Sequence, residues 1–115
     1  MNRLFVYGSL KQGFHNAGYL ASASYLGDFE TQNIYTMYNF GNYPGVTAQG
    51  NSAIFGEVYA VDQIQFAAID KLEGYPDFYQ REIIRTAYGE AWIYIVNASL
   101  CINKKTVLSG QWLAQ

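Results

Sequence analysis

The chain has 115 residues, of which 50% are hydrophobic and 14% are charged, and this balance excludes an intrinsically disordered protein. Its net charge is −2, and no run rich in Lys or Arg extends beyond Lys104-Lys105, so we expect no nucleic-acid partner. The length fits one domain over residues 1–115, with a core that needs neither a disulfide nor a structural metal. Eleven Tyr, seven Phe and two Trp are typical of a strand-rich protein whose rings fill a core or line a pocket.

The sequence contains no signal for export or for a membrane. The single cysteine, Cys101, cannot form an internal disulfide, which favours a reducing compartment. Residues 1–6 run directly into a strand pattern without the features of a signal peptide, and no 18 consecutive residues are apolar. We therefore expect a cytoplasmic protein with no membrane partner.

The first half of the chain contains several strand patterns. Residues 4–7 form an apolar run that predicts a buried strand ending in a turn at residues 8–10, and residues 17–26 allow a short helical turn before a second strand. Residues 34–40 have a strand composition and precede a loop at 41–45, where Pro44 excludes a central strand. Residues 53–61 give the strongest internal strand pattern, and Gly56 within it indicates a bulge or the close approach of another backbone.

One helix is predicted with clear signals at both ends. Asp62 can cap its start, with Gln65 at the third helical position completing a capping box. The helix should end near Glu73, because Gly74 suits the left-handed position after a helix and Pro76 prevents continuation. Apolar residues recur with a period of four, at Ile64, Ala68 and Leu72.

The second half of the chain contains another pair of strand patterns. Residues 80–88 and 91–96 flank Gly89-Glu90, which predicts a tight hairpin, while the pattern of the tail after Val96 is ambiguous. Strands do not alternate regularly with helices. We therefore predict an α+β fold, in which a small mixed β-barrel or a strongly curved sheet of five to seven strands is accompanied by a few short helices.

The reactive side chains exclude several kinds of site. His15 is the only histidine, and with one cysteine the chain offers no zinc-ligand spacing, so we expect no metal site. A Ser-His-Asp triad would need His15, but the sequence has no Gly-x-Ser-x-Gly motif. The backbone N–H groups of Gly8, Ser9 and Leu10 could instead converge on an anion, although the same residues also fit an ordinary turn.

Glu73 is the most informative acidic residue. A carboxylate at the negative end of a helix dipole costs about 0.3–1 kcal/mol, which favours its protonated form. Ile69 lies one turn earlier on the same face and would place Glu73 in a partly apolar setting. The pattern therefore predicts a carboxyl group poised for proton transfer, or an exposed glutamate that simply ends the helix. The segment 74–81 that follows fits either a pocket wall or a loop.

The order of these motifs resembles the γ-glutamylcyclotransferase-like superfamily. The resemblance rests on Leu4-Phe5-Val6-Tyr7-Gly8-Ser9-Leu10-Lys11, then Gly56-Glu57-Val58-Tyr59, then Leu72-Glu73-Gly74-Tyr75-Pro76 with Tyr79 and Arg81. The chain is most similar to small bacterial-type members related to γ-glutamylamine cyclotransferase. The resemblance implies a small mixed β-barrel with a few helices, a cavity between the first turn and Glu73, and no cofactor.

The resemblance also implies a reaction and a set of roles. The α-amine of a γ-glutamyl compound attacks its own γ-carbonyl group, which releases 5-oxoproline and an amine. Glu73 would be the general base and acid, and the N–H groups of Gly8, Ser9 and Leu10 would bind the α-carboxylate or the oxyanion. The pocket would be shaped by other side chains, namely Tyr7, Asn16, Tyr79 and Arg81. Ser9 stands where many relatives have threonine, which retains the hydroxyl group.

Two other functions fit the same sequence. A non-catalytic module could use the cavity to bind a small carboxylate or a peptide terminus, but it would have no use for an acid with a raised pKa. An interaction protein would expose its aromatic residues in a large apolar patch. The poised glutamate therefore favours an enzyme acting on a small γ-glutamyl substrate.

Overall fold

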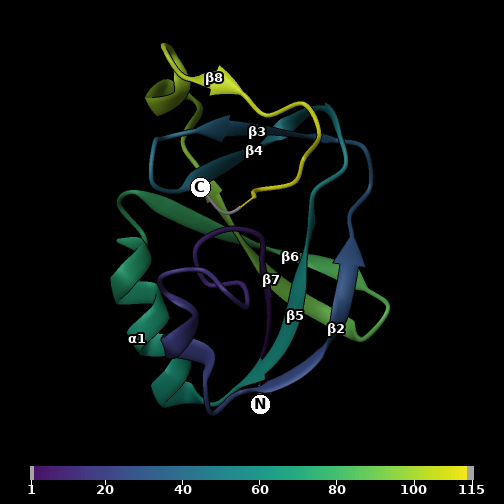
Figure 1. Cartoon of the computed structure of the whole chain (residues 1–115), viewed down its shortest axis with the longest axis vertical. Helices are drawn as coiled ribbons and strands as arrows, with labels where there is room; N and C mark the ends of the chain where they lie inside the picture. Colours follow the sequence, from purple (N-terminus) through teal and green to yellow (C-terminus); the bar gives the residue numbers. More distant parts are fainter. Residues whose placement is uncertain (1, 114–115) are drawn as a thin grey trace.

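The computed structural model describes residues 2–113, which form two β-sheets and one α-helix. In Figure 1 the smaller sheet lies at one end of the larger sheet, and α1 lies along one side. The elements in chain order are β1 (Asn2–Val6), η1 (Ala17–Leu20), β2 (Ser24–Glu30), β3 (Tyr35–Asn39), β4 (Pro44–Ser52), β5 (Phe55–Val61), α1 (Gln63–Glu73), β6 (Tyr79–Thr86), β7 (Gly89–Val96), η2 (Ala98–Cys101) and β8 (Lys105–Thr106).

The mixed α+β class is confirmed, but the predicted barrel and strand count are corrected. The five-stranded sheet has the order β2-β5-β1-β7-β6, with β1 and β7 parallel, and the three-stranded sheet has the order β4-β3-β8. Within residues 2–113 no ladder joins the edge strands β2 and β6, so the sheet does not close. The eight strands include β4 and β8, which the sequence patterns did not predict. The polar, Gly-containing composition of β4 gives a weak pattern because it belongs to an edge strand.

The central strand β1 is covered on both faces. Leu4 and Val6 belong to a buried cluster that includes Phe66 and Ile69 of α1, whereas Phe5 belongs to a second cluster with residues of the smaller sheet. Successive side chains of a strand point to opposite faces, so one apolar run fills both clusters. Because β1 is surrounded in this way, its end at the following turn is held in place.

The start and end of α1 are as predicted, but its buried face is different. The Asp62 side chain accepts a hydrogen bond from the Gln65 N–H, and the Gln65 side chain accepts one from the Asp62 N–H. Phe66 and Ile69 are the buried residues, whereas Ile64 is 83% exposed. Of the Ile64, Ala68 and Leu72 stripe, only Leu72 packs against the core, because the sheet contacts the side of the helix that carries Phe66 and Ile69.

The hairpin between β6 and β7 turns two residues earlier than predicted. Thr86 pairs with Gly89, so Ala87 and Tyr88 form the turn and Gly89 begins β7. The Thr86 hydroxyl group stabilises this turn by accepting a hydrogen bond from the Tyr88 N–H at 3.0 Å and donating one to the Gly89 carbonyl oxygen at 2.6 Å. The predicted close approach at Gly56 is confirmed, since a Cβ atom there would overlap the backbone of β1.

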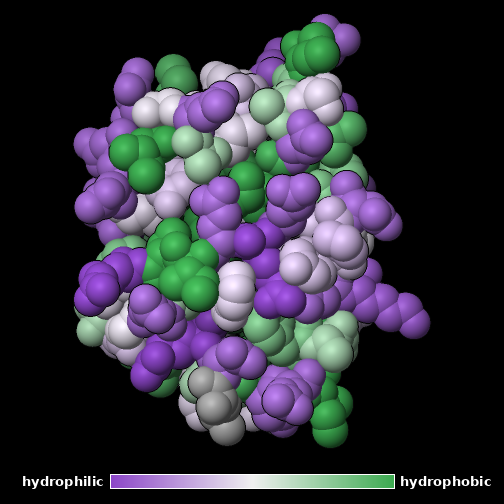
Figure 2. Space-filling view, turned by 180° about the vertical axis from the view of Figure 1, so that it is seen from behind, coloured by the Kyte–Doolittle hydropathy of each residue, from purple (hydrophilic) through white to green (hydrophobic). Residues whose placement is uncertain are grey.

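Hydrophobic residues on the surface are dispersed on the face shown in Figure 2. They form small groups separated by hydrophilic residues, without one continuous apolar area. This face therefore gives no support to an interaction protein with a large aromatic patch. Within residues 2–113, no helix has the length and apolar character that a membrane crossing requires.

Candidate active site

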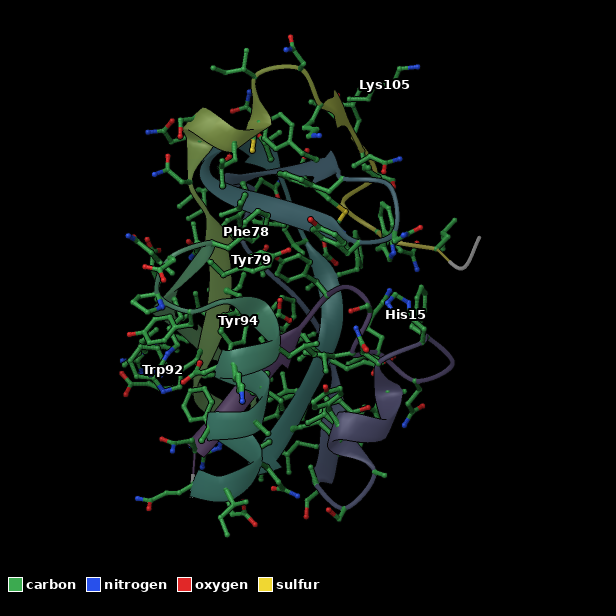
Figure 3. All side chains as sticks on the ribbon, turned by 90° about the vertical axis from the view of Figure 1, so that its left-hand side faces the viewer. His15, Phe78, Tyr79, Trp92, Tyr94 and Lys105 are labelled. Atoms are coloured by element: carbon green, nitrogen blue, oxygen red, sulfur yellow. The ribbon has the colours of Figure 1, made fainter. Side chains whose placement is uncertain are left out.

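A cavity of about 370 Å³ lies where the end of β1, the end of α1 and the start of β4 meet. Figure 3 shows Tyr79 and Tyr94 on the strand side of this region and His15 on the loop opposite. The volume falls in the range of sites that bind small molecules. The cavity is lined by Phe5, Val6, Tyr7, Gly8, Ser9, Leu10, His15, Asn16, Tyr43, Pro44, Leu72, Glu73, Gly74, Phe78, Tyr79 and Tyr94.

The turn after β1 forms one wall of the cavity. The Lys11 N–H donates a hydrogen bond to the Gly8 carbonyl oxygen at 3.1 Å, which closes the turn. Gly8 does not have a positive φ angle; a Cβ atom at this position would lie 2.7 Å from the Pro44 ring. Glycine is therefore needed here for the close approach of Pro44 at the start of β4, and not for a left-handed backbone conformation.

Asn16 fixes the same turn by hydrogen bonds, and the turn retains backbone N–H groups that have no backbone acceptor in the turns and loops of the described chain. The Asn16 N–H donates to the Ser9 carbonyl oxygen at 2.9 Å, and the Asn16 side-chain amide donates to the Ser9 hydroxyl oxygen at 2.9 Å. Within residues 2–113, the N–H groups of Gly8, Ser9 and Leu10 have no backbone acceptor in the turns and loops. These residues line the cavity, and their N–H groups keep the capacity to donate to an anion.

Glu73 lines the same cavity from the last position of α1. Gly74 follows it in the left-handed conformation, with φ of 68°, which confirms the predicted helix end. Burial, and secondly the negative charge of Asp70, raise the pKa of the Glu73 carboxyl group from 4.5 to about 7. No hydrogen bond from the described part of the chain offsets this shift. Glu73 is therefore ionised in only part of the molecules at neutral pH.

Three tyrosine hydroxyl groups fix the cavity wall by donating to internal acceptors. Tyr7 donates to the Tyr94 carbonyl oxygen at 2.8 Å, and Tyr79 donates to the Pro44 carbonyl oxygen at 2.6 Å. Tyr94 donates to the Asp70 carboxylate at 2.6 Å. Burial raises the pKa of each of these tyrosines above its ordinary value. The hydroxyl groups therefore remain protonated and keep these positions over the working pH range.

Arg81 does not line the cavity, which corrects its predicted place in the pocket. Its guanidinium group packs against the rings of Phe66, Tyr75 and Trp92, at 4.2–4.6 Å from their centroids. Arg81 also forms an ion pair with Asp70 at 3.3 Å. Arg81 follows Tyr79 by two residues in β6, and a strand advances about 3.3 Å per residue. The Arg81 side chain therefore lies farther from the cavity than the Tyr79 side chain does, beside α1. Arg81 thus contacts Asp70, one turn before Glu73.

The structure brings the other predicted site residues together and adds some that the sequence analysis missed. Tyr7, Gly8, Ser9, Leu10, Asn16, Glu73 and Tyr79 all line the cavity. The additional lining side chains include His15, Tyr43, Pro44, Phe78 and Tyr94. Tyr94 pairs with Arg81 across β6 and β7. A correct prediction of this hairpin register would have indicated that Tyr94 lies beside the helix.

The described residues offer no cluster of metal ligands. No group of three or more His, Cys, Asp or Glu side chains within residues 2–113 is arranged to hold a metal ion. The polar groups of the cavity are backbone N–H groups, one carboxyl group, an amide, an imidazole and hydroxyl groups. Such a set can bind a carboxylate and move protons.

Comparison with known proteins identifies the family. The family model described as "Gamma-glutamyl cyclotransferase, AIG2-like" matches residues 4–114. The chain belongs to this family. It is also 40% identical, over 111 residues, to the gamma-glutamylcyclotransferase family protein YtfP of Escherichia coli K12, with 96% of both chains covered. The chain is thus a γ-glutamylcyclotransferase-like enzyme.

Solved structures support the same fold. The solution NMR structure of YtfP from Escherichia coli is 42% identical and superimposes with a TM-score of 0.77, covering 96% of each chain. An AIG2-like protein from Mus musculus is 23% identical and gives a TM-score of 0.80, covering 95% of this chain and 87% of that chain. The overall fold of the chain is therefore shared with these structures.

Proposed function

We propose that the enzyme cyclises a small γ-glutamyl compound to 5-oxoproline and releases an amine or amino acid. The observation that carries this proposal is the shared cavity of Glu73 and the turn at Gly8, Ser9 and Leu10. An acid with a pKa near 7 and three residues whose N–H groups have no backbone acceptor in the turns and loops of the described chain line the same cavity. These are the two kinds of group that an intramolecular aminolysis requires.

The reaction needs no nucleophile from the protein. The α-amine nitrogen forms a bond to the γ-carbonyl carbon, and the amide bond between that carbon and the leaving nitrogen breaks. Both reacting groups belong to one substrate, so the protein contributes by folding the substrate and stabilising charge. The rigid cavity wall, in which Tyr7 and Tyr79 are fixed by hydrogen bonds, suits this positioning role.

Glu73 is proposed as the group that moves the protons. In its ionised form it accepts a proton from the α-ammonium group, which frees the lone pair that attacks. In its protonated form it donates to the leaving nitrogen. A single group performs both steps well when its pKa is close to the working pH, and burial brings the Glu73 pKa to about 7.

The N–H groups of the first turn are proposed to bind negative charge. The substrate carries an α-carboxylate, and its γ-carbonyl oxygen becomes an oxyanion when the ring closes. The N–H groups of Gly8, Ser9 and Leu10 are suited to one of these two oxygens. Asn16 holds the turn through Ser9, so we propose it as a positioning residue. Arg81 is proposed to influence the site only indirectly, through its ion pair with Asp70.

The test is a turnover screen across γ-glutamyl amines and γ-glutamyl amino acids, with 5-oxoproline and the released amine measured together. The proposal predicts equal amounts of both products. The alternative, a non-catalytic module for small carboxylates, predicts a thermal shift with 5-oxoproline but no product. A ligand at 100 times its Kd would stabilise the fold by about 2.7 kcal/mol. Binding without any turnover would therefore replace the enzyme proposal with the binding module.

A further inference from the structure

A second hollow adjoins the cavity of the candidate active site. It has a volume of about 560 Å³ and is lined by Gly13, Phe14, His15, Gly41, Asn42, Trp112 and Leu113. We call it the outer groove. His15 lines both the cavity and the outer groove. In Figure 3 the His15 side chain lies between the loop that carries it and the C-terminal segment. The loop before β4 also joins the two, because Asn42 lines the outer groove and Tyr43 lines the cavity.

Apart from the His15 imidazole, the side chains that line the outer groove carry no titratable group. Phe14, Trp112 and Leu113 provide apolar surface, and none of the lining residues is acidic. The Lys11 amino group lies 4.8 Å from the Phe14 ring centroid and donates a hydrogen bond to the Trp112 carbonyl oxygen at 2.7 Å. This contact holds the C-terminal segment beside the loop of His15. A cationic ligand would therefore lose hydration in the groove without gaining a carboxylate partner.

The position of the outer groove fits one part of the substrate. The reaction divides the substrate between its γ-carbonyl carbon and the leaving nitrogen. If the glutamyl part occupies the cavity between Glu73 and Gly8, the leaving amine must extend away from it, and the outer groove is the adjoining space at His15. The exposed apolar part of this lining, at Phe14 and Leu113, gains affinity from apolar groups that it removes from water.

We infer that the outer groove binds the leaving amine, and that it selects γ-glutamyl compounds with an uncharged apolar tail over those with a second positive charge. This inference rests on the proposed function, and it adds the substrate class. It assigns Phe14, Leu113 and Asn42 to substrate selection.

Two matched substrates test this selection directly. γ-Glutamylhexylamine and γ-glutamylcadaverine have tails of the same length, which end in a methyl group and an ammonium group respectively. We expect kcat/KM for the hexylamine compound to be about tenfold higher or more, because a charge is costly to desolvate without a partner. Equal or reversed values would overturn the assignment of the groove while leaving the proposed function intact.

A charge introduced into the groove provides the second arm of the test. Asn42 is exposed, and Asn42→Asp adds a negative charge with little change in shape. It should reduce the preference for the hexylamine compound about three- to tenfold, through attraction of the ammonium group. The control is Asn33→Asp, at an exposed position that precedes β3, whereas Asn42 follows β3. It should leave the ratio of the two kcat/KM values unchanged. An equal effect of both variants would contradict the groove assignment. If no γ-glutamyl compound is converted to 5-oxoproline, the proposed function and this inference both fall.

Discussion

The substitution Glu73→Gln should make the protein more stable at high pH while it removes activity. Folding raises the pKa of this carboxyl group from 4.5 to about 7, so the folded state binds more protons than the unfolded chain between these values. Stability contributed by the protonated group is therefore present below pH 4.5 and is lost as the pH rises to about 7. Each unit of pKa difference corresponds to about 1.36 kcal/mol, so ionising Glu73 costs the folded state up to roughly 3 kcal/mol at pH 8.

Glutamine removes this cost because it stays neutral at every pH. We expect the melting temperature of Glu73→Gln to exceed that of the wild type by on the order of 10 °C at pH 8, and to approach it at pH 4. Thermal unfolding across this pH range, followed by circular dichroism, measures the difference. Glu90→Gln, at an exposed position, is the control and should show no such pH-dependent gain. Parallel curves for wild type and Glu73→Gln would refute the burial of this carboxyl group.

Two further substitutions test the walls of the cavity. Gly8→Ala should cost about 1–3 kcal/mol of stability and reduce turnover, because its Cβ atom would lie 2.7 Å from the Pro44 ring. A Cβ atom at Gly18 would have no neighbour within 4 Å, so the control Gly18→Ala should preserve stability and turnover. Equal effects of the two variants would contradict the close packing at Gly8. Asp70→Asn should lower the Glu73 pKa by removing a nearby negative charge, so the acidic limb of the pH profile of kcat/KM should move to lower pH. An unchanged limb would show that Asp70 does not influence Glu73.

The parts of the site that depend on local signals could be predicted from the sequence. Asp62 and Gln65 define the helix start, and Gly74 defines its end, because capping is a matter of residues close in the chain. These signals placed Glu73 at the last position of the helix. The apolar run of β1 likewise predicted where the turn at Gly8 begins.

The parts that depend on distant contacts could not be predicted. The side of α1 that faces the sheet is set by packing, so the spacing of Ile64, Ala68 and Leu72 did not reveal that Phe66 and Ile69 are the residues that the helix buries. The pairing of β4 with β3 is set by tertiary contacts, and its polar composition gave no strand pattern. For the same reason the family resemblance implied a pocket role for Arg81, whereas aromatic rings and Asp70 hold this side chain beside the helix.

The most direct test of the account is the rate of 5-oxoproline formation by the wild type and Glu73→Gln as a function of pH. We predict that kcat/KM of the wild type rises through a pKa of about 7, the value that burial gives Glu73. The folded Glu73→Gln variant should be slower by about 100-fold or more over the whole range, as expected when a general base is removed. Turnover by Glu73→Gln at a rate close to that of the wild type would contradict the role of this residue.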